Sequence, residues 1–207
     1  LSFERTELLL GRLRKANLAH SISYSQKHYV AVRERKNIWL YVRPRPNQIR
    51  LETRIVDEDI DLVALENGGR AIECSDEHYG SMKNLNVPGR GMNMGDGWET
   101  ARRRGPGNDW VILALGAPGV VTSAEIDTAH FKGNYPDRVM LEAAMFGDDG
   151  EATLAKEAWQ VLLPETKLEP DRQHDFDTLA ELGTVSHVRV SVFPDGGISR
   201  VRLFGRP

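Results

Sequence analysis

From about residue 57 onward, the chain consists of short apolar runs separated by Gly, Pro, Asn and Asp residues. This texture is typical of an all-β sandwich or barrel, because each run is long enough for one strand and each break suits a turn. Strands are predicted at 109–115, 120–127, 139–146, 185–193 and 198–204. Short helices are predicted at 60–65 and 151–162, where apolar residues recur near helical spacing.

The last two predicted strands read as a hairpin. The turn between them, 193–197, contains Pro194, Gly196 and Gly197, and such residues favour tight turns. Alternation places one set of side chains in the core, namely Val188, Val190, Val192, Val201 and Leu203. The opposite face is then strongly cationic, with His187, Arg189, Arg200 and Arg202.

Residues 1–57 differ in kind from the rest. They hold 12 Lys and Arg against 5 Asp and Glu, whereas residues 58–207 hold 15 against 25. A helix is predicted at 2–18 and strands at 38–42 and 49–56, which makes this a short mixed segment without a recognised motif. Its basic charge shows no recognition-helix or zinc-knuckle pattern, so we interpret it as a solvated or interface-forming segment and expect no nucleic-acid partner.

Composition restricts the setting. The chain is 40% hydrophobic and 28% charged, which suits one or two globular domains. No apolar run approaches the roughly 18 residues that span a bilayer, so no membrane association is expected. Cys74 is the only cysteine, which excludes an intrachain disulfide and a thiolate zinc site and fits a reducing, cytoplasmic location.

A long polar segment at 67–107 concentrates ionisable groups. It contains Asp76, Glu77 and His78, then Asp96 and Glu99, then Arg102, Arg103 and Arg104. Its apolar members are expected to need burial, which disfavours disorder; they are Tyr79, Met92, Met94 and Trp98. Loops of this length with this content are usually functional.

A second cluster follows the strand predicted at 120–127. If Ile126 faces the core, Asp127 faces away from it, and His130 and Asn134 lie on the following loop, where a rigid strand can orient them.

The two clusters carry a family resemblance. The runs SDEHYG, PGRGMNMGDGWETARRRGPGNDW, DTAHFKGNYP and HVRVSVFPDGGISRVRLFG resemble, in order and spacing, the repeat of the allantoicase family. The resemblance implies a galactose-binding-like jelly-roll β-sandwich over 58–207, one complete repeat similar to the second of the family's two. It also implies hydrolysis of allantoate to ureidoglycolate and urea.

For that substrate, the residues suggest a division of roles. The carboxylate suits a planar guanidinium, with Arg102, Arg103, Arg189 and Arg202 as candidates. The ureido groups suit Asn134 and Asp96. The general base is predicted to be His78 or His130, oriented by Asp76, Glu77 or Asp127. The catalytic set is thus His78, Glu99, Asp127 and His130, with Asp76 in substrate binding.

Some alternatives stay open. Side chains alone can carry the proton transfer, so no cofactor is expected, although a divalent metal held by Asp76, His78, Asp127 and His130 is possible. The chain could instead be a non-catalytic ligand-binding module or an inactive remnant of the enzyme. Exposed sheet edges favour a homo-oligomer. The central expectation is that the loops near residues 78 and 130 converge on one pocket.

Overall fold

The computed structural model describes residues 21–25, 29–35, 38–45, 48–55, 59–155 and 157–207. Strands β1 (Ser21–Ser25), β2 (Tyr29–Arg35), β3 (Ile38–Arg45) and β4 (Gln48–Ile55) form one antiparallel sheet in that order. The strands predicted at 38–42 and 49–56 are therefore confirmed, although β3 continues through Pro44. The helix predicted at 2–18 lies outside the described residues.

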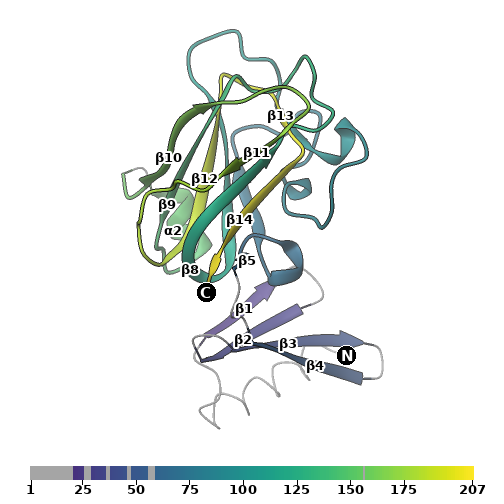
Figure 1. The fold of residues 1–207 in the computed structure, drawn as a ribbon, viewed down its shortest axis with the longest axis vertical. Helices are drawn as coiled ribbons and strands as arrows, with labels where there is room; N and C mark the ends of the chain where they lie inside the picture. The colour runs from purple at the N-terminus through teal and green to yellow at the C-terminus, as the bar shows by residue number, and fades with distance from the viewer. Residues whose placement is uncertain (1–20, 26–28, 36–37, 46–47, 56–58, 156) are drawn as a thin grey trace.

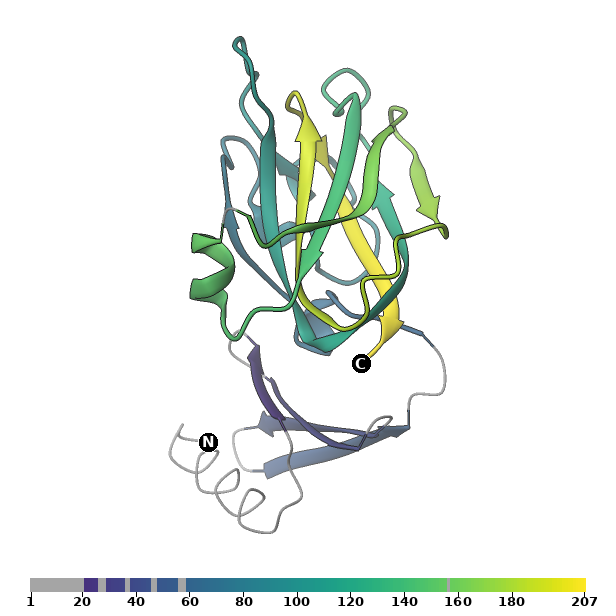
Figure 2. The same cartoon turned by 90° about the vertical axis from the view of Figure 1, so that its left-hand side faces the viewer.

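The remainder is a two-layer jelly-roll β-sandwich, as the sequence predicts (Figures 1 and 2). One layer has the order β10–β9–β12–β8–β6, and the other has the order β11–β8–β14–β5. Their strands are β5 (Ile60–Asp61), β6 (Arg70–Cys74), β8 (Asp109–Asp127), β9 (Arg138–Ala144), β10 (Gln160–Lys167), β11 (Gln173–Phe176), β12 (Val185–Phe193) and β14 (Arg200–Arg206). A further pair, β7 (Trp98–Glu99) and β13 (Gly197–Ile198), closes one end.

Strand β8 belongs to both layers. Residues 109–119 pair with β12 and residues 120–127 pair with β14. The sequence predicted two strands with a break at residues 116–119, where Gly116, Pro118 and Gly119 cluster. That break is instead the bend at which one continuous strand passes from layer to layer, visible at the lower end of the sandwich in Figure 2.

The core lies between the layers and confirms the predicted alternation. Val188, Val190 and Val192 of β12 face Val201 and Leu203 of β14, and all five side chains are fully buried. Burying one such aliphatic side chain is worth about 1.5–3 kcal/mol, so this apolar set supplies much of the driving force for folding.

The predicted hairpin is wrong. Strands β12 and β14 lie in opposite layers, each pairing with a different half of β8. The turn at 193–197 therefore crosses the end of the sandwich. An apolar face that alternates along both strands is equally compatible with a hairpin and with a layer crossing, which is why the sequence did not distinguish the two.

The predicted helices agree with the structure less closely than the predicted strands do. Residues 60–65 contain β5 and a turn that leads into the 3-10 helix η1 (Leu65–Asn67). Residues 151–162 begin with the last four residues of α2 (Asp149–Leu154), but β10 then starts at residue 160. The polar segment at 67–107 contains β6 and two more 3-10 helices, η2 (Met82–Asn84) and η3 (Met94–Asp96), where no regular structure was predicted. Among the apolar residues expected to be buried there, only Trp98 is; Tyr79, Met92 and Met94 are exposed.

The face opposite the core is not an open cationic surface. His187 and Arg200 are buried, and Arg189 and Arg202 are partly buried. Arg189 donates to Glu142 through Nε and Nη2 at 2.8 and 2.9 Å. Arg200 and Arg202 are covered by the segment before β7, whose backbone carbonyls accept their hydrogen bonds. Local alternation cannot reveal these distant partners.

Gly197 is the position where the crossing turn has least room. An added Cβ would lie 2.0 Å from the ring of buried Phe131, and nothing lies within 4 Å of the corresponding position at Gly105. We expect Gly197→Ala to lower the free energy of unfolding by about 1–3 kcal/mol through overpacking. Gly105→Ala is the control and should change it by less than about 0.5 kcal/mol. Chemical denaturation of both variants checks this, and equal midpoints would contradict the packing described.

Candidate functional site

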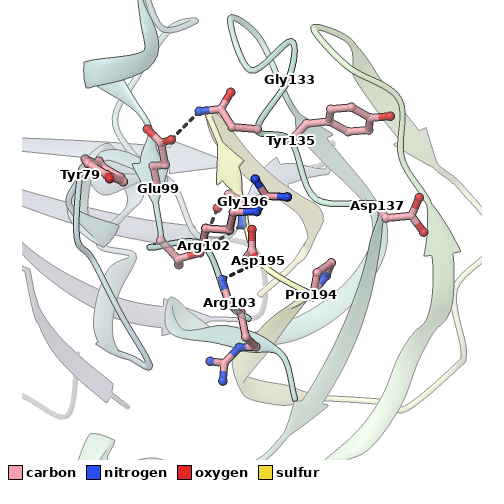
Figure 3. Close-up of a pocket in the computed structure, with 12 residues that line it drawn as sticks. Tyr79, Glu99, Arg102, Arg103, Gly133, Tyr135, Asp137, Pro194, Asp195 and Gly196 are labelled. Atoms are coloured by element: carbon pink, nitrogen blue, oxygen red, sulfur yellow. Dashed lines mark hydrogen bonds between the residues drawn. The ribbon is translucent and has the colours of Figure 1, made fainter. Parts of the chain in front are cut away.

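A cleft of about 540 Å³ opens at the end of the sandwich where β12 ends and β9 and β14 begin (Figure 3). Four segments supply its walls: the chain after β6, β7 with the residues that follow it, the loop between β8 and β9, and the crossing turn. The lining residues are Tyr79, Glu99, Thr100, Arg102, Arg103, Gly133, Asn134, Tyr135, Asp137, Pro194, Asp195 and Gly196. The site is thus built on strand ends, which a packed core holds rigidly.

Strand β7 and the segment that follows it are bonded to the crossing turn at three residues. Glu99 pairs with Gly197 in the β7–β13 ladder. Thr100 exchanges bonds with Gly196: its backbone N–H donates to the Gly196 carbonyl at 3.4 Å, and its Oγ1 accepts from the Gly196 N–H at 3.1 Å. The Arg103 N–H then donates to Asp195 Oδ2 at 2.8 Å. This ladder places both walls of the cleft at a fixed separation.

Asp76 fastens the same segment from the other side. Its Oδ2 accepts the backbone N–H of Ala101 at 2.5 Å, and its carbonyl accepts the indole Nε1–H of buried Trp98 at 2.8 Å. Asp76 does not line the cleft. Its observed contacts are with the protein backbone and Trp98, whereas the sequence suggested a substrate contact.

Glu99 and Asn134 meet across one end of the cleft. The Asn134 amide Nδ2 donates to Glu99 Oε1, and a dashed line at the labelled Glu99 in Figure 3 marks this bond. Glu99 has this single side-chain partner among the described residues, so Oε2 and further lone pairs stay available to a ligand or water. The pair therefore presents the carboxylate acceptor of Glu99 beside the side-chain amide of Asn134.

The two neighbouring arginines point in different directions. Figure 3 shows Arg102 reaching into the space among the lining residues and Arg103 turning away beneath the turn. The Arg103 guanidinium donates through Nη2 to Asp109, a buried carboxylate that also accepts from Ser75 Oγ at 3.0 Å. Arg102 makes no hydrogen bond or ion pair with any described residue. Of the two, only Arg102 has an uncompensated charge in the cleft.

Asp127 and His130 lie outside the cleft lining and hold another loop. Ile126 belongs to the core cluster and Asp127 does not, as expected, but Asp127 is still fully buried and accepts Arg90 Nε and Nη2 at 2.8 and 3.2 Å. His130 bonds through Nε2 to the Gly91 carbonyl at 2.9 Å. The hydrogen bonds to Asp127 raise the pKa of Arg90. Together these contacts fasten the loop that leads to η3 and β7.

His78 and Asp96 also lie outside the lining. His78 is exposed and contacts Tyr79 ring to edge, with 4.4 Å between centroids. Asp96 accepts the Met92 N–H at 2.7 Å within its own loop. The loops near residues 78 and 130 both reach the cleft, but they do so through Tyr79 and Asn134, not through the histidines themselves.

Arg189 and Arg202 are engaged elsewhere. The guanidinium of Arg189 is paired with Glu142 and lies over the Trp159 ring, 5.1 Å from its centroid. Arg202 donates to the carbonyls of Val87 and Gly89 at 2.7 and 2.9 Å. Neither lines the cleft, so of the predicted substrate and catalytic residues the structure brings together Glu99, Arg102, Arg103 and Asn134.

Sequence reasoning did not select several lining residues. Asp195 was visible in the sequence within PDGG, but it was interpreted only as part of a turn. Asp137 and Tyr135 follow Asn134 directly, and their cleft position depends on where β9 begins. Within the described residues, no three His, Cys, Asp or Glu side chains form a group that could hold a metal ion. The described helices are also too short or too polar to cross a bilayer.

The sandwich architecture has known counterparts. A family 32 carbohydrate-binding module from Clostridium perfringens superimposes with a TM-score of 0.54 at 10% identity, covering 72% of this chain and 96% of that one. A similarity this remote concerns the fold alone. It places the chain in the class of galactose-binding-like jelly rolls.

Closer matches identify the family. The allantoicase repeat model matches residues 60–207, and the chain belongs to the allantoicase family. A probable allantoicase from Pseudomonas paraeruginosa is 56% identical over 151 residues, and one from Photobacterium profundum is 51% identical over 169. These matches cover 72% and 80% of this chain and 46% and 50% of those proteins.

A solved structure agrees with the sequence matches. The crystal structure of allantoicase from Saccharomyces cerevisiae superimposes with a TM-score of 0.63 at 37% identity, covering 76% of this chain and 46% of that one. The chain thus spans about half the length of the relatives that it matches.

The Arg90–Asp127 pair provides a test of the loop fastening. Arg90→Met leaves the buried Asp127 carboxylate without its cation, and because the Arg90 side chain is half exposed, water offsets part of the loss. We expect the free energy of unfolding to fall by about 1–2 kcal/mol. Arg104→Met, at an exposed position, is the control. Identical denaturation curves for the two variants would show that the pair does not fasten the loop.

Proposed function

We propose that this chain hydrolyses allantoate to ureidoglycolate and urea, using the cleft at the end of the sandwich. The observation that carries the proposal is the combination, in one cleft of an allantoicase repeat, of an unpaired guanidinium, a carboxylate with free lone pairs and an amide. These residues are Arg102, Glu99 and Asn134.

The groups match the substrate. Allantoate has a carboxylate and two ureido arms on one central carbon. The planar guanidinium of Arg102 can bind both carboxylate oxygens at once. The amide of Asn134 can donate to a ureido carbonyl, and Glu99 can accept from a ureido N–H. A binding site so arranged holds the central carbon near Glu99.

The reaction replaces one bond at that carbon. A C–O bond forms with water and a C–N bond to one ureido nitrogen breaks, while a proton from the water goes to the departing urea nitrogen. We assign Glu99 as the base that accepts the proton and returns it to the leaving group, a role open to a positioned carboxylate. His78, on the segment that supplies Tyr79, stays a second candidate for this transfer. The scheme uses side chains alone and needs no cofactor.

Other residues from the predicted site receive supporting roles in this proposal. Asp127 and His130 hold the loop before β7 and so keep Glu99 in place. Arg103 secures its own backbone against the turn. The lone cysteine is consistent with a cytoplasmic location, and the exposed sheet edges support self-association.

A non-catalytic module on the same fold is the competing function. A ligand-binding module needs the cleft but has no turnover and so no general base. A hydrolase needs both. Because the chain spans about half the length of its relatives, activity of this single repeat is itself part of the proposal.

Urea release from allantoate by the purified protein, with and without a chelator, distinguishes the two. We expect Glu99→Gln to lower kcat by about 100-fold or more, since general acid–base catalysis is worth about that much. Arg102→Met should raise KM at least tenfold by removing a charge-assisted contact of about 1.5–3 kcal/mol. Arg104→Met, which removes an exposed neighbouring charge, should leave both constants unchanged. Absence of urea release from the parent protein would overturn the proposal.

A further inference from the structure

Arg102 stands between two backbone amides that are each held by a carboxylate. On one side the Ala101 N–H donates to Asp76 Oδ2 at 2.5 Å, and on the other the Arg103 N–H donates to Asp195 Oδ2 at 2.8 Å. The two carboxylates come from different segments, one from the segment after β6 and the other from the crossing turn. The backbone is therefore held at the residue before Arg102 and at the residue after it.

The neighbouring arginine side chain adds a third constraint. Arg103 is drawn away from the cleft by its ion pair with Asp109, which is 2% exposed. The Arg103 side chain is thus held below the turn, whereas Figure 3 shows the Arg102 side chain reaching into the cleft.

The side chain so directed has no partner of its own. Arg102 is exposed and unpaired among the described residues, although Asp76, Asp195 and Asp109 all lie on the adjoining structure. Each of those carboxylates is bound to a neighbour of Arg102 instead. An arginine whose backbone is held and whose guanidinium is free is preorganised in part for an external anion, because only its side chain still has to be ordered on binding.

We propose that Asp76 and Asp195 are positioning residues, which hold the backbone on each side of Arg102 so that its guanidinium is presented to the carboxylate of the substrate. In this scheme, the Oδ2 atoms of Asp76 and Asp195 accept backbone N–H groups and do not contact the ligand. The identity of the ligand rests on the proposed function. The new element is that Asp76 and Asp195 contribute to substrate affinity indirectly, through Arg102.

A double-mutant cycle tests whether Asp195 acts through Arg102. The probes are the KM for allantoate and the dissociation constant of glycolate, a small hydroxy-carboxylate, measured by NMR titration without turnover. We expect Asp195→Ala to weaken glycolate binding and to raise KM about tenfold, equivalent to about 1.4 kcal/mol, with kcat changed less than twofold. In the Arg102→Met background, the same substitution should change both constants less than twofold.

Two further variants separate positioning from loss of structure. Asp195→Asn keeps an oxygen that can accept the Arg103 N–H, so it should restore binding to within about threefold of the parent. Asp177→Ala removes an exposed aspartate far along the chain and serves as the matched control. If Asp195→Ala fails to fold, the cycle is run with Asp76→Ala, whose carboxylate holds the amide on the other side of Arg102.

The outcomes are distinct. Equal losses with and without Arg102, or no loss from Asp195→Ala, would overturn the positioning role. A parent protein that binds glycolate through Arg102 but releases no urea would overturn the proposed function and leave the positioning role supported. A parent protein that releases urea but does not bind glycolate would overturn the positioning role alone, and one that neither binds glycolate nor releases urea would overturn both.

Discussion

The constraint on which the site depends is the ladder between the segment after β7 and the crossing turn. Pairing of Glu99 with Gly197 continues through Thr100 and Gly196 to the bond between Arg103 and Asp195. Without it, residues 92 and 96 positions apart in sequence would have no fixed separation. With it, the side chains of the segment after β7 face the crossing turn across the cleft.

The sandwich supplies that ladder with its anchor points. Because β8 crosses between layers, its two ends meet at the same end of the molecule, together with the end of β12 and the start of β9. The crossing turn is confined there by close packing of Gly197 against Phe131. The core thus determines where the loops emerge, and the loops determine which polar groups meet.

The sequence predicted more of the fold than of the site, for a physical reason. Alternation of Val188 and its neighbours reports directly on the core, and it was confirmed. The layer crossing after β12 was not predicted, because alternation does not say which partner a strand takes. At the site, Glu99 and Asn134 were selected through the family resemblance and do meet. The burial of Asp127 depends on Arg90, a long-range partner that no local pattern reveals.

The proposed site requires that the backbone around Arg102 is held before any ligand binds. Amide hydrogen exchange of the ligand-free protein tests it most directly. We predict that the amides of Ala101 and Arg103 exchange at least about a hundredfold more slowly than that of Arg104, and that Asp195→Ala releases Arg103 while Trp98 stays protected. Exchange of Ala101 and Arg103 as fast as Arg104 in the parent protein would contradict the account.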